Sequence, residues 1–296
     1  MIRNIIRALR LPFISASALP FIFGSLIKRE DFNFLGFSLG LGAVIATHLS
    51  ANLINDYADS KSGADWQDKN FYKFFGGSKL IQEKVLSEGF YLKASVLFLI
   101  ISFFCILLLA LNLKSLFVSV VYLPILFLAW SYSARPFQFS YRRKGEMVIL
   151  LLFGPVPVMG GYFIQTGIFP DFKSFILSLP LGFLTTAILF ANEVPDFKDD
   201  RKVRKINWVS FVGEKQAFLL YYLLIFFAFF TIIISILLRY LHPLALLSAI
   251  GALMAVKAAE ILRAFPDDKK QLITSSRLTI AAHTIASLIL ILAVIL

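Results

Sequence analysis

Residues 34–65 of the chain read FLGFSLGLGAVIATHLSANLINDYADSKSGAD. Residues 34–55 contain no Asp, Glu, Lys or Arg, and a run of roughly 20 mostly apolar residues is long enough to cross a bilayer as a helix. Acidic side chains follow at once, beginning with Asp56. The stretch therefore predicts a transmembrane helix that brings a group of carboxylates to one surface of the membrane.

Apolar runs of similar length recur along the whole chain. Hydrophobic residues make up 58% of the sequence and charged residues only 16%, whereas a soluble domain has about 25% charged residues. Lipid offers no hydrogen-bond partners to an open backbone, so such runs are expected to be helical. We expect nine spans, at residues 11–27, 34–56, 94–112, 115–132, 146–165, 174–194, 216–238, 242–262 and 275–296. The predicted fold is all-α: a polytopic membrane protein in the lipid bilayer, with residues 1–296 as a single domain and residues 1–10 as an amphipathic segment at the interface.

Positive charges are distributed unevenly among the segments between these spans. If the N-terminus faces the cytoplasm, 24 of the 29 Lys and Arg residues lie on the cytoplasmic side, in residues 1–10, 57–93, 133–145, 195–215 and 257–277. Because this bias orients membrane proteins, we expect the N-terminus and the acidic residues at the cytoplasmic face of the cell's inner (cytoplasmic) membrane. The net charge of +11 does not indicate nucleic-acid binding, since the charges flank apolar spans and form no basic helix.

Two short motifs carry acidic residues at the cytoplasmic ends of spans. The first motif contains Asn52, Asp56 and Asp59, and the second contains Asn192, Asp196 and Asp200. Spacings of three and four residues place the three side chains of each motif on one face of a helix. Carboxylates at membrane depth are costly and usually functional, so we interpret both motifs as parts of a site.

Two opposed acidic faces would repel each other unless a cation lay between them. Hard oxygen donors favour Mg²⁺, which typically takes one or two carboxylates, retains water and bridges to substrate phosphates. We therefore predict a Mg²⁺ site formed by Asp56, Asp59, Asp65, Asp196 and Asp200. The alternative interpretation, solvated charges at helix ends, accounts for one such cluster more readily than for two with closely similar spacing.

The motifs resemble those of the UbiA superfamily of membrane prenyltransferases. Asn55-Asp56-x2-Asp59 and Asn192-x3-Asp196-x3-Asp200 are similar to its two aspartate-rich motifs. Three segments are closest to the 1,4-dihydroxy-2-naphthoate polyprenyltransferase branch: Asn55-Asp56-Tyr57-x-Asp59-x3-Gly63-x-Asp65, Gly76-Gly77-Ser78-Lys79, and residues 153–167. One departure concerns Tyr132 and Arg135, whose register differs from the family's pairing of a tyrosine with a nearby lysine.

The resemblance implies a nine-helix bundle that transfers a polyprenyl group from a polyprenyl diphosphate to a small aromatic acceptor. The branch implies 1,4-dihydroxy-2-naphthoate as the acceptor, in menaquinone biosynthesis. Mg²⁺ would neutralise the charge that develops on the leaving diphosphate. The expected catalytic residues are Asp56, Asp59, Asp196 and Asp200. The expected residues for binding the diphosphate or the acceptor are Asn52, Asn55, Tyr57, Lys79, Tyr132, Arg135, Asn192, Lys198 and Arg201.

Two alternatives stay open at this level. Within the superfamily, the acceptor could be 4-hydroxybenzoate, homogentisate, chlorophyllide, haem or glycerol phosphate. Outside it, acidic residues in membranes also mark ion pathways, so a transporter or Mg²⁺ channel is the competing class. The location of the motifs favours an enzyme, because both lie at one surface and the outer halves of the spans lack a series of ionisable residues.

Overall fold

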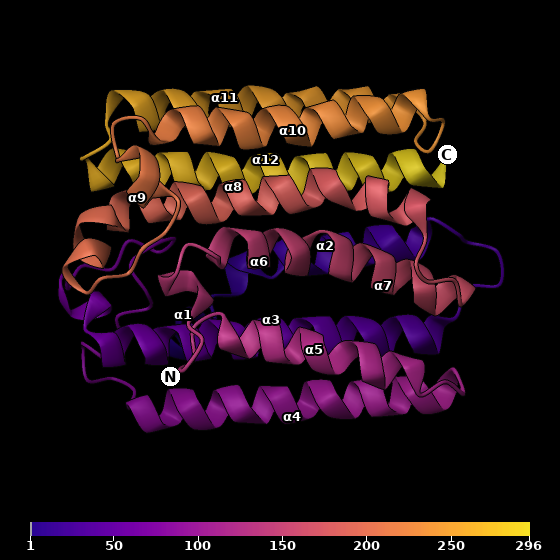
Figure 1. Ribbon diagram of the computed structural model, residues 1–296, viewed down its shortest axis with the longest axis horizontal. Helices are drawn as coiled ribbons and strands as arrows, with labels where there is room; N and C mark the ends of the chain where they lie inside the picture. The colour runs from indigo at the N-terminus through magenta and orange to yellow at the C-terminus, as the bar shows by residue number, and fades with distance from the viewer. Residues whose placement is uncertain (1) are drawn as a thin grey trace.

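The computed structural model describes residues 2–296, and within this range the chain is a bundle of helices without a β-strand. The longer helices run side by side along the long axis of the molecule (Figure 1). Their bounds are α1 Ile2–Ala8, α2 Ser15–Leu26, α3 Phe34–Ser62, α4 Glu88–Asn112, α5 Phe117–Ser131, α6 Gly145–Phe153, α7 Pro155–Thr166, α8 Phe172–Lys202, α9 Val209–Val212, α10 Ala217–Leu237, α11 Ala249–Ala264 and α12 Lys269–Ile295. The predicted all-α fold is confirmed.

The nine predicted spans agree approximately with the helices. Among residues 2–296, seven helical segments are long and apolar enough to cross a membrane, and the N-terminal helices, bent by 46°, form an eighth candidate. The predicted span at residues 115–132 corresponds to α5, which has only 15 residues. In Figure 1, α1 lies toward one end of the bundle and the C-terminus lies at the other end. The chain is a multi-pass membrane protein.

The N-terminal segment, expected at the interface, folds as a separate short helix. Residues 2–8 form α1, and Arg10 then adopts a left-handed backbone conformation with φ of 49° that turns the chain before α2. Ile2 and most of its neighbours in α1 are exposed. Met1, which belongs to the predicted segment, lies outside the described residues.

Both helices that carry the acidic motifs extend beyond the predicted spans. The sequence places the ends of these spans at residues 56 and 194, whereas α3 continues to Ser62 and α8 to Lys202. Gly63 ends α3 in a left-handed conformation with φ of 86°, which glycine adopts without steric cost. Because the helices continue, both motifs keep the helical spacing that brings their side chains to one face.

The predicted span at residues 146–165 is divided into α6 and α7 at Gly154. Pro155 occupies the first turn of α7, where its missing N–H costs no helical hydrogen bond. A Cβ on Gly154 would lie 2.7 Å from the Cα of Gly182, so glycine lets this break pack directly on α8. The close crossing holds α6 against α8, the helix of the second motif.

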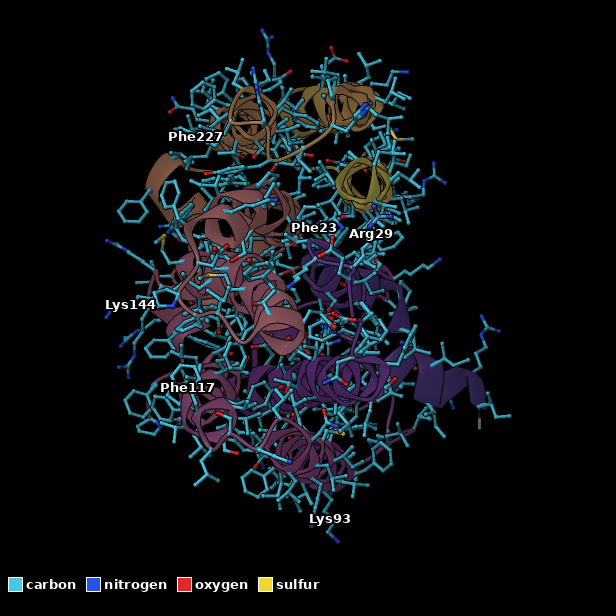
Figure 2. The ribbon with its side chains drawn as sticks, turned by 90° about the vertical axis from the view of Figure 1, so that its right-hand side faces the viewer. Phe23, Arg29, Lys93, Phe117, Lys144 and Phe227 are labelled. Carbon is cyan, nitrogen blue, oxygen red and sulfur yellow. The ribbon has the colours of Figure 1, made fainter. Side chains whose placement is uncertain are left out.

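The outside of the bundle is covered by large apolar side chains. Phe117 and Phe227 lie at the periphery in Figure 2, and both are exposed, whereas Phe23 lies between helices and is fully buried. A soluble monomer rarely exposes apolar surface on this scale. The exposed phenylalanines therefore face lipid.

Candidate active site

A cavity opens among α2, α3, α5, α6 and α8 and the loop segments 64–79 and 203–208. Its inner wall is apolar and includes Val44, Ile125, Leu152, Val156 and Leu189, whereas its mouth carries carboxylates and lysines. The empty volume is about 1730 Å³, including the part open to solvent.

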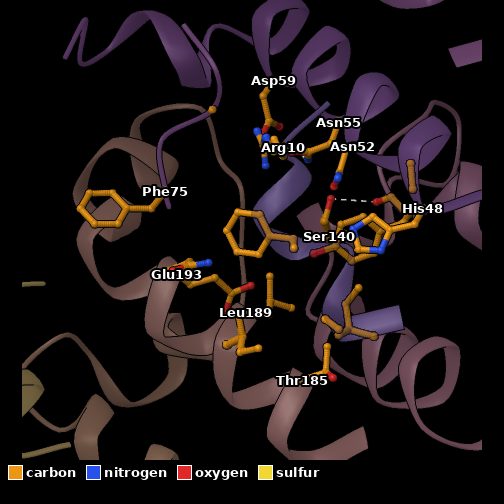
Figure 3. Close-up of a pocket in the computed structure, with 18 of the residues that line it drawn as sticks. Arg10, His48, Asn52, Asn55, Asp59, Phe75, Ser140, Thr185, Leu189 and Glu193 are labelled. Atoms are coloured by element: carbon orange, nitrogen blue, oxygen red, sulfur yellow. Dashed lines mark hydrogen bonds between the residues drawn. The ribbon is translucent and has the colours of Figure 1, made fainter. Parts of the chain in front are cut away.

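The last turns of α3 bring the first motif to the cavity. Asn52, Asn55 and Asp59 line one side of it, opposite Thr185, Leu189 and Glu193 of α8 (Figure 3). Asp56 is buried just behind this wall, where it pairs with the guanidinium of Arg10 and accepts a 3.2 Å hydrogen bond from the Ser78 amide.

Asp59 is held by two donors from distant parts of the chain. The Tyr141 hydroxyl donates a 2.5 Å hydrogen bond to its Oδ1, and Lys205 Nζ lies 3.3 Å from its Oδ2. The same ammonium lies 3.5 Å from Asp200 Oδ1. Burial acts to lower the pKa of Lys205, but Asp200 and Asp59 outweigh it and hold that pKa well above its usual value. One protonated lysine therefore bridges the two motifs.

A glycine-rich loop, residues 76–79, covers both motifs. The Gly76 amide donates a 2.9 Å hydrogen bond to Asp196 Oδ2, while the Ser78 amide donates to Asp56. Gly76 and Gly77 have φ of 72° and 75°, in the left-handed region that favours glycine. A Cβ on Gly77 would lie 2.3 Å from Asp65 Oδ2. Only glycine lets the backbone approach the carboxylates this closely.

The pKa of Asp65, which follows the end of α3, is strongly shifted. Lys79 Nζ donates to its backbone oxygen at 2.8 Å and to its carboxylate at 3.2 Å. Burial, with repulsion from Asp59 and Asp56, raises the pKa of Asp65 to about 8 despite the opposing charge of Lys79. A carboxyl group with this pKa holds its proton at neutral pH, and a further positive charge beside it would release that proton.

The second motif faces the cavity from α8. Asn192, Asp196 and Asp200 all line it. The Oδ1 atom of Asn192 is buried without a hydrogen-bond partner, and Asp200 accepts a long hydrogen bond of 3.5 Å from Asn207. Unpaired or weakly paired oxygens at this wall are available to a ligand that carries positive charge or N–H and O–H donors.

At the rim, Lys269 joins two carboxylates that are not among the predicted metal ligands. Its Nζ lies 2.8 Å from Asp68 Oδ2 and 2.9 Å from Asp199 Oδ2. Burial acts to raise the pKa of Asp68, but hydrogen bonds from Lys269, the Asn70 amide and the Tyr72 hydroxyl lower it to about 2. Asp68 is therefore ionised throughout the neutral range, and all three charged residues line the cavity.

The predicted metal ligands fit Mg²⁺ by chemistry, although other cations engage them here. Within residues 2–296, no three acidic, His or Cys side chains are grouped so as to hold a metal ion by themselves. Instead, Arg10 pairs with Asp56 and Lys79 pairs with Asp65. Lys205 pairs with both Asp59 and Asp200. The oxygens are largely buried and anionic, and Mg²⁺ completes such a partial set with water and phosphate. The carboxylates therefore have the donor chemistry that suits the ion, and in this structure basic side chains occupy them.

Four residues predicted to bind substrate lie away from the cavity. Lys198 is 61% exposed and pairs with Asp267, because α8 turns this position to the surface. The Arg201 guanidinium covers the Phe197 ring instead, and Arg135 is exposed in a turn. Tyr57 lies on the α3 face that packs against the core cluster of Leu53, Leu80 and Tyr91. The structure does not place these four residues in the cavity wall, whereas Lys79 and Tyr132 do line it, and the predicted roles stay predictions.

Sequence reasoning missed several cavity residues. They are Arg10, Asp68, Glu193, Asp199, Lys205 and Lys269. Asp199 and Glu193 lie within the second motif, so helical spacing could have suggested them. Arg10, Lys205 and Lys269 come from three separate segments, and nothing in their local sequence distinguishes them from cations that orient the spans.

Comparison with known protein families identifies the family to which the chain belongs. The model of the UbiA prenyltransferase family matches residues 17–279, which is most of the chain. The chain belongs to the UbiA prenyltransferase family. It is similar to mouse UbiA prenyltransferase domain-containing protein 1, with 30% identity over 235 residues, 76% of this chain and 67% of the relative. Curated relatives of that name are matched over 62% to 69% of their own length.

Solved structures of UbiA homologues share this fold. The apo homologue from Aeropyrum pernix K1 superposes with a TM-score of 0.72 at 16% identity, over 94% of this chain and 97% of that one. A homologue from Archaeoglobus fulgidus bound to GPP and Mg²⁺ gives a TM-score of 0.60 at 16% identity, over 97% and 99%. These relatives' names do not specify a dihydroxynaphthoate acceptor, so the predicted branch of the UbiA family gains no support from them.

Proposed function

We propose that this chain is an integral membrane prenyltransferase that uses Mg²⁺ to transfer a polyprenyl group from a polyprenyl diphosphate to a small aromatic acceptor. The finer proposal, based on the sequence resemblance, is that the acceptor is 1,4-dihydroxy-2-naphthoate, in menaquinone biosynthesis. Residues 1–296 would act as a single membrane domain. The cavity mouth would face the cytoplasm at the cell's inner membrane, as the distribution of Lys and Arg indicates.

One observation carries the proposal: two acidic motifs meet at the mouth of a cavity with an apolar interior. A prenyl diphosphate has this same division, with an apolar tail and a multiply charged head. The tail matches the wall formed by Val44, Ile125 and Leu152. The head matches the mouth, where cationic side chains and backbone amides accompany the aspartates.

The residues suggest how the site would cleave the substrate. Asp56, Asp59, Asp65, Asp196 and Asp200 would hold Mg²⁺, which supplies charge neutralisation as the diphosphate leaves. Lys79 and Lys205, freed from their carboxylates, would donate to the phosphate oxygens. The apolar wall would exclude water from the allylic cation. Tyr132 lines the cavity and offers an aromatic face to that cation.

A transfer assay with purified protein tests the proposal. The protein, reconstituted in liposomes with Mg²⁺, would receive geranylgeranyl diphosphate and a panel of acceptors that includes 1,4-dihydroxy-2-naphthoate, 4-hydroxybenzoate and homogentisate. Mass spectrometry should detect a prenylated acceptor, and a colorimetric assay should detect diphosphate. Diphosphate release without any prenylated acceptor across the panel would contradict transfer to an aromatic ring. Preference for another acceptor would contradict only the finer proposal.

A further inference from the structure

A pair of buried glutamates lies beside the cavity and has no part in holding the metal or the diphosphate. Glu193 of α8 lines the cavity and is 8% exposed, and Glu146 of α6 is completely buried. The two carboxyl groups are neighbours across the contact between α6 and α8. Two acidic groups in one buried place are costly, so their retention there calls for a functional reason.

The hydrogen bonds of the pair are incomplete. Glu146 Oε1 accepts a hydrogen bond from the Trp208 amide, which fixes this side chain. Glu146 Oε2 and Glu193 Oε2 are buried without any other partner, and the two carboxyl groups lie within hydrogen-bond reach of each other, so one proton can be shared between them. Glu193 belongs to the cavity wall, and its other carboxylate oxygen is not among the buried atoms, so a donor on a bound molecule can reach that oxygen.

The position of Glu193 suggests which molecule this is. Along α8, Thr185 and Leu189 line the apolar part of the cavity, and Asp196 and Asp200 line its charged mouth. Glu193 lies between these two parts (Figure 3). A prenyl diphosphate placed with its tail inside and its head at the mouth has its allylic carbon at this level. The acceptor ring has to reach that carbon, so its polar groups come within reach of Glu193.

Tyr132 gives this part of the cavity a flat aromatic wall. An ideal Cβ on Gly145 would lie 3.3 Å from the Tyr132 ring and 3.0 Å from the Ser140 Cα, so glycine at the start of α6 makes room for this packing. Tyr132 and Ser140 both line the cavity. An aromatic wall beside a buried carboxyl group suits a hydroxylated aromatic ring, which stacks on one and donates to the other.

We propose that Glu193 is the residue that binds a hydroxyl group of the aromatic acceptor and removes its proton during transfer, while Glu146 positions it. This inference rests on the proposed function. The C–O bond of the prenyl diphosphate breaks and its electron pair leaves with diphosphate. The ring carbon beside the hydroxyl bonds to the allylic carbon as the hydroxyl proton passes to Glu193. The ring then loses a proton or CO₂ from that carbon, and Glu193 returns its proton to the oxygen.

The substrate class follows from this chemistry. The acceptor presents a phenolic hydroxyl, not an anionic group, to Glu193, because a second anion beside two buried carboxyl groups would be repelled. An acceptor whose hydroxyl is methylated has no proton to give. It would leave Glu193 unpaired as well, and an unpaired buried partner weakens binding strongly.

The experiment compares the variants Glu193→Gln, Glu193→Asp, Glu146→Gln and Glu260→Gln with the wild-type protein in liposomes. Geranylgeranyl diphosphate is used with the best acceptor of the panel and its O-methyl ether. Prenylated acceptor, diphosphate and geranylgeraniol are all quantified. Glu260 is exposed on α11 and serves as the matched control.

Glu193→Gln should lower transfer by about a hundredfold, the range of a lost general base, while diphosphate release continues and geranylgeraniol replaces the transfer product. Its KM for geranylgeranyl diphosphate should stay at the wild-type value, and continued diphosphate release shows that the variant is folded. Glu193→Asp should recover part of the loss. Glu146→Gln should raise the KM for the acceptor more than it lowers kcat, and Glu260→Gln should match the wild type.

The experiment distinguishes failure of the role of Glu193 from failure of the proposed function. Wild-type rates of transfer in Glu193→Gln, or equal use of the O-methyl ether by the wild type, would overturn the role of Glu193 and leave the proposed function intact. Loss of diphosphate release together with transfer in both Glu193→Gln and Glu193→Asp would also overturn it, because Glu193 would then serve the diphosphate or the fold. Absence of transfer by the wild-type protein would instead contradict the proposed function.

Discussion

The first acidic motif, at the end of α3, and the second, at the end of α8, have nearly the same spacing but are held differently. Asp56 and Asp59 pair with cations that come from the N-terminal segment and from the loop after α8. Asp196 accepts a backbone hydrogen bond from Gly76, and Asp200 pairs with Lys205, only five residues further along the chain. Each motif also accepts one backbone hydrogen bond from the glycine loop, Asp56 from Ser78 and Asp196 from Gly76. The difference lies in the cations, which reach the first motif from distant segments and the second motif from its own loop.

This difference indicates how the site could change when a substrate binds. A side-chain cation can move from a carboxylate to a phosphate at small cost, because it exchanges one ionic partner for another. A backbone amide in a glycine loop cannot move as freely. We therefore expect the cations to exchange partners on binding, whereas the backbone contacts from Gly76 and Ser78 stay in place.

Removal of the divalent cation should have the largest effect, since it affects both motifs at once. Chelation with EDTA should abolish diphosphate release, and added Mg²⁺ should restore it, because the diphosphate leaves poorly without charge neutralisation. The measurement is diphosphate release by the wild-type protein in liposomes. Full activity in EDTA would show that neither motif holds a catalytic metal.

Neutralising one aspartate in each motif should have the next-largest effect on activity. Asp56→Asn and Asp196→Asn keep the size of the side chain but remove the charge that binds the metal, so activity should fall by roughly a hundredfold or more. Steady-state kinetics gives the loss, and thermal melting in detergent is the folding control. Unchanged turnover in one variant would mean that only the other motif holds the metal.

Lys205 and Lys198 provide a matched pair of lysines near the second motif. The side chain of Lys205 is 14% exposed and lies between Asp59 and Asp200, whereas that of Lys198 is 61% exposed. Lys205→Met should lower kcat/KM about tenfold or more, because it removes the cation that joins the motifs. Lys198→Met should stay within about twofold, since exposed ion pairs contribute little. Equal effects of the two substitutions would contradict the bridging role of Lys205.

The glycine loop can be tested with two glycines that have nearly the same positive φ. Gly77 and Gly213 have φ of 75° and 74°, but only Gly77 would bring a Cβ against a carboxylate, at 2.3 Å from Asp65. Alanine at either position should cost about 1–3 kcal/mol of stability from the positive φ, which Gly213 combines with a ψ of 160° that few residues other than glycine adopt. Gly77→Ala should in addition lower transfer several-fold by displacing Asp65. If Gly213→Ala lowered transfer equally, strain alone would explain the loss.

Cysteine substitutions at exposed positions should have the smallest effect on activity. They test whether the two motifs lie at one surface of the membrane. In a Cys105→Ala background, single cysteines at Lys61 and Lys202, both exposed beside the motifs, and at Glu30, exposed at the far end of α2, would be labelled with a membrane-impermeant maleimide. Lys61→Cys and Lys202→Cys should react from the same side and Glu30→Cys from the other. Labelling of the two motif positions from opposite sides would refute the shared site.

Much of the fold follows from the sequence because lipid imposes a simple rule. Apolar runs of sufficient length have to be helical, so residues 34–55 and their counterparts indicated the bundle. The spacing of Asn52, Asp56 and Asp59 indicated a shared helical face, and this arrangement is local. The ends of α3 and α8 were placed too early, because hydropathy marks where apolar residues stop and not where helical hydrogen bonding stops.

The partners of the carboxylates depended on the tertiary structure. Arg10, Lys79 and Lys205 are far apart in the chain, and only the packing of α2, α3 and α8 brings them to the same group of aspartates. Their local sequence resembles that of Lys198 and Arg201, which were predicted at the site and lie outside the cavity. A charge near a motif is a local property, whereas the direction of its side chain depends on helix rotation and loop path.

The sequence by itself determined that the chain crosses a membrane repeatedly and ends two of its helices in aspartate motifs. Those features depend on composition and on spacing within one helix, which are local. Only the tertiary structure decided that Glu146 and Glu193 meet beside the cavity, since they belong to different helices that touch through Gly154 and Gly182. Contacts between distant segments follow from shape and close packing, and no short stretch of sequence contains that information.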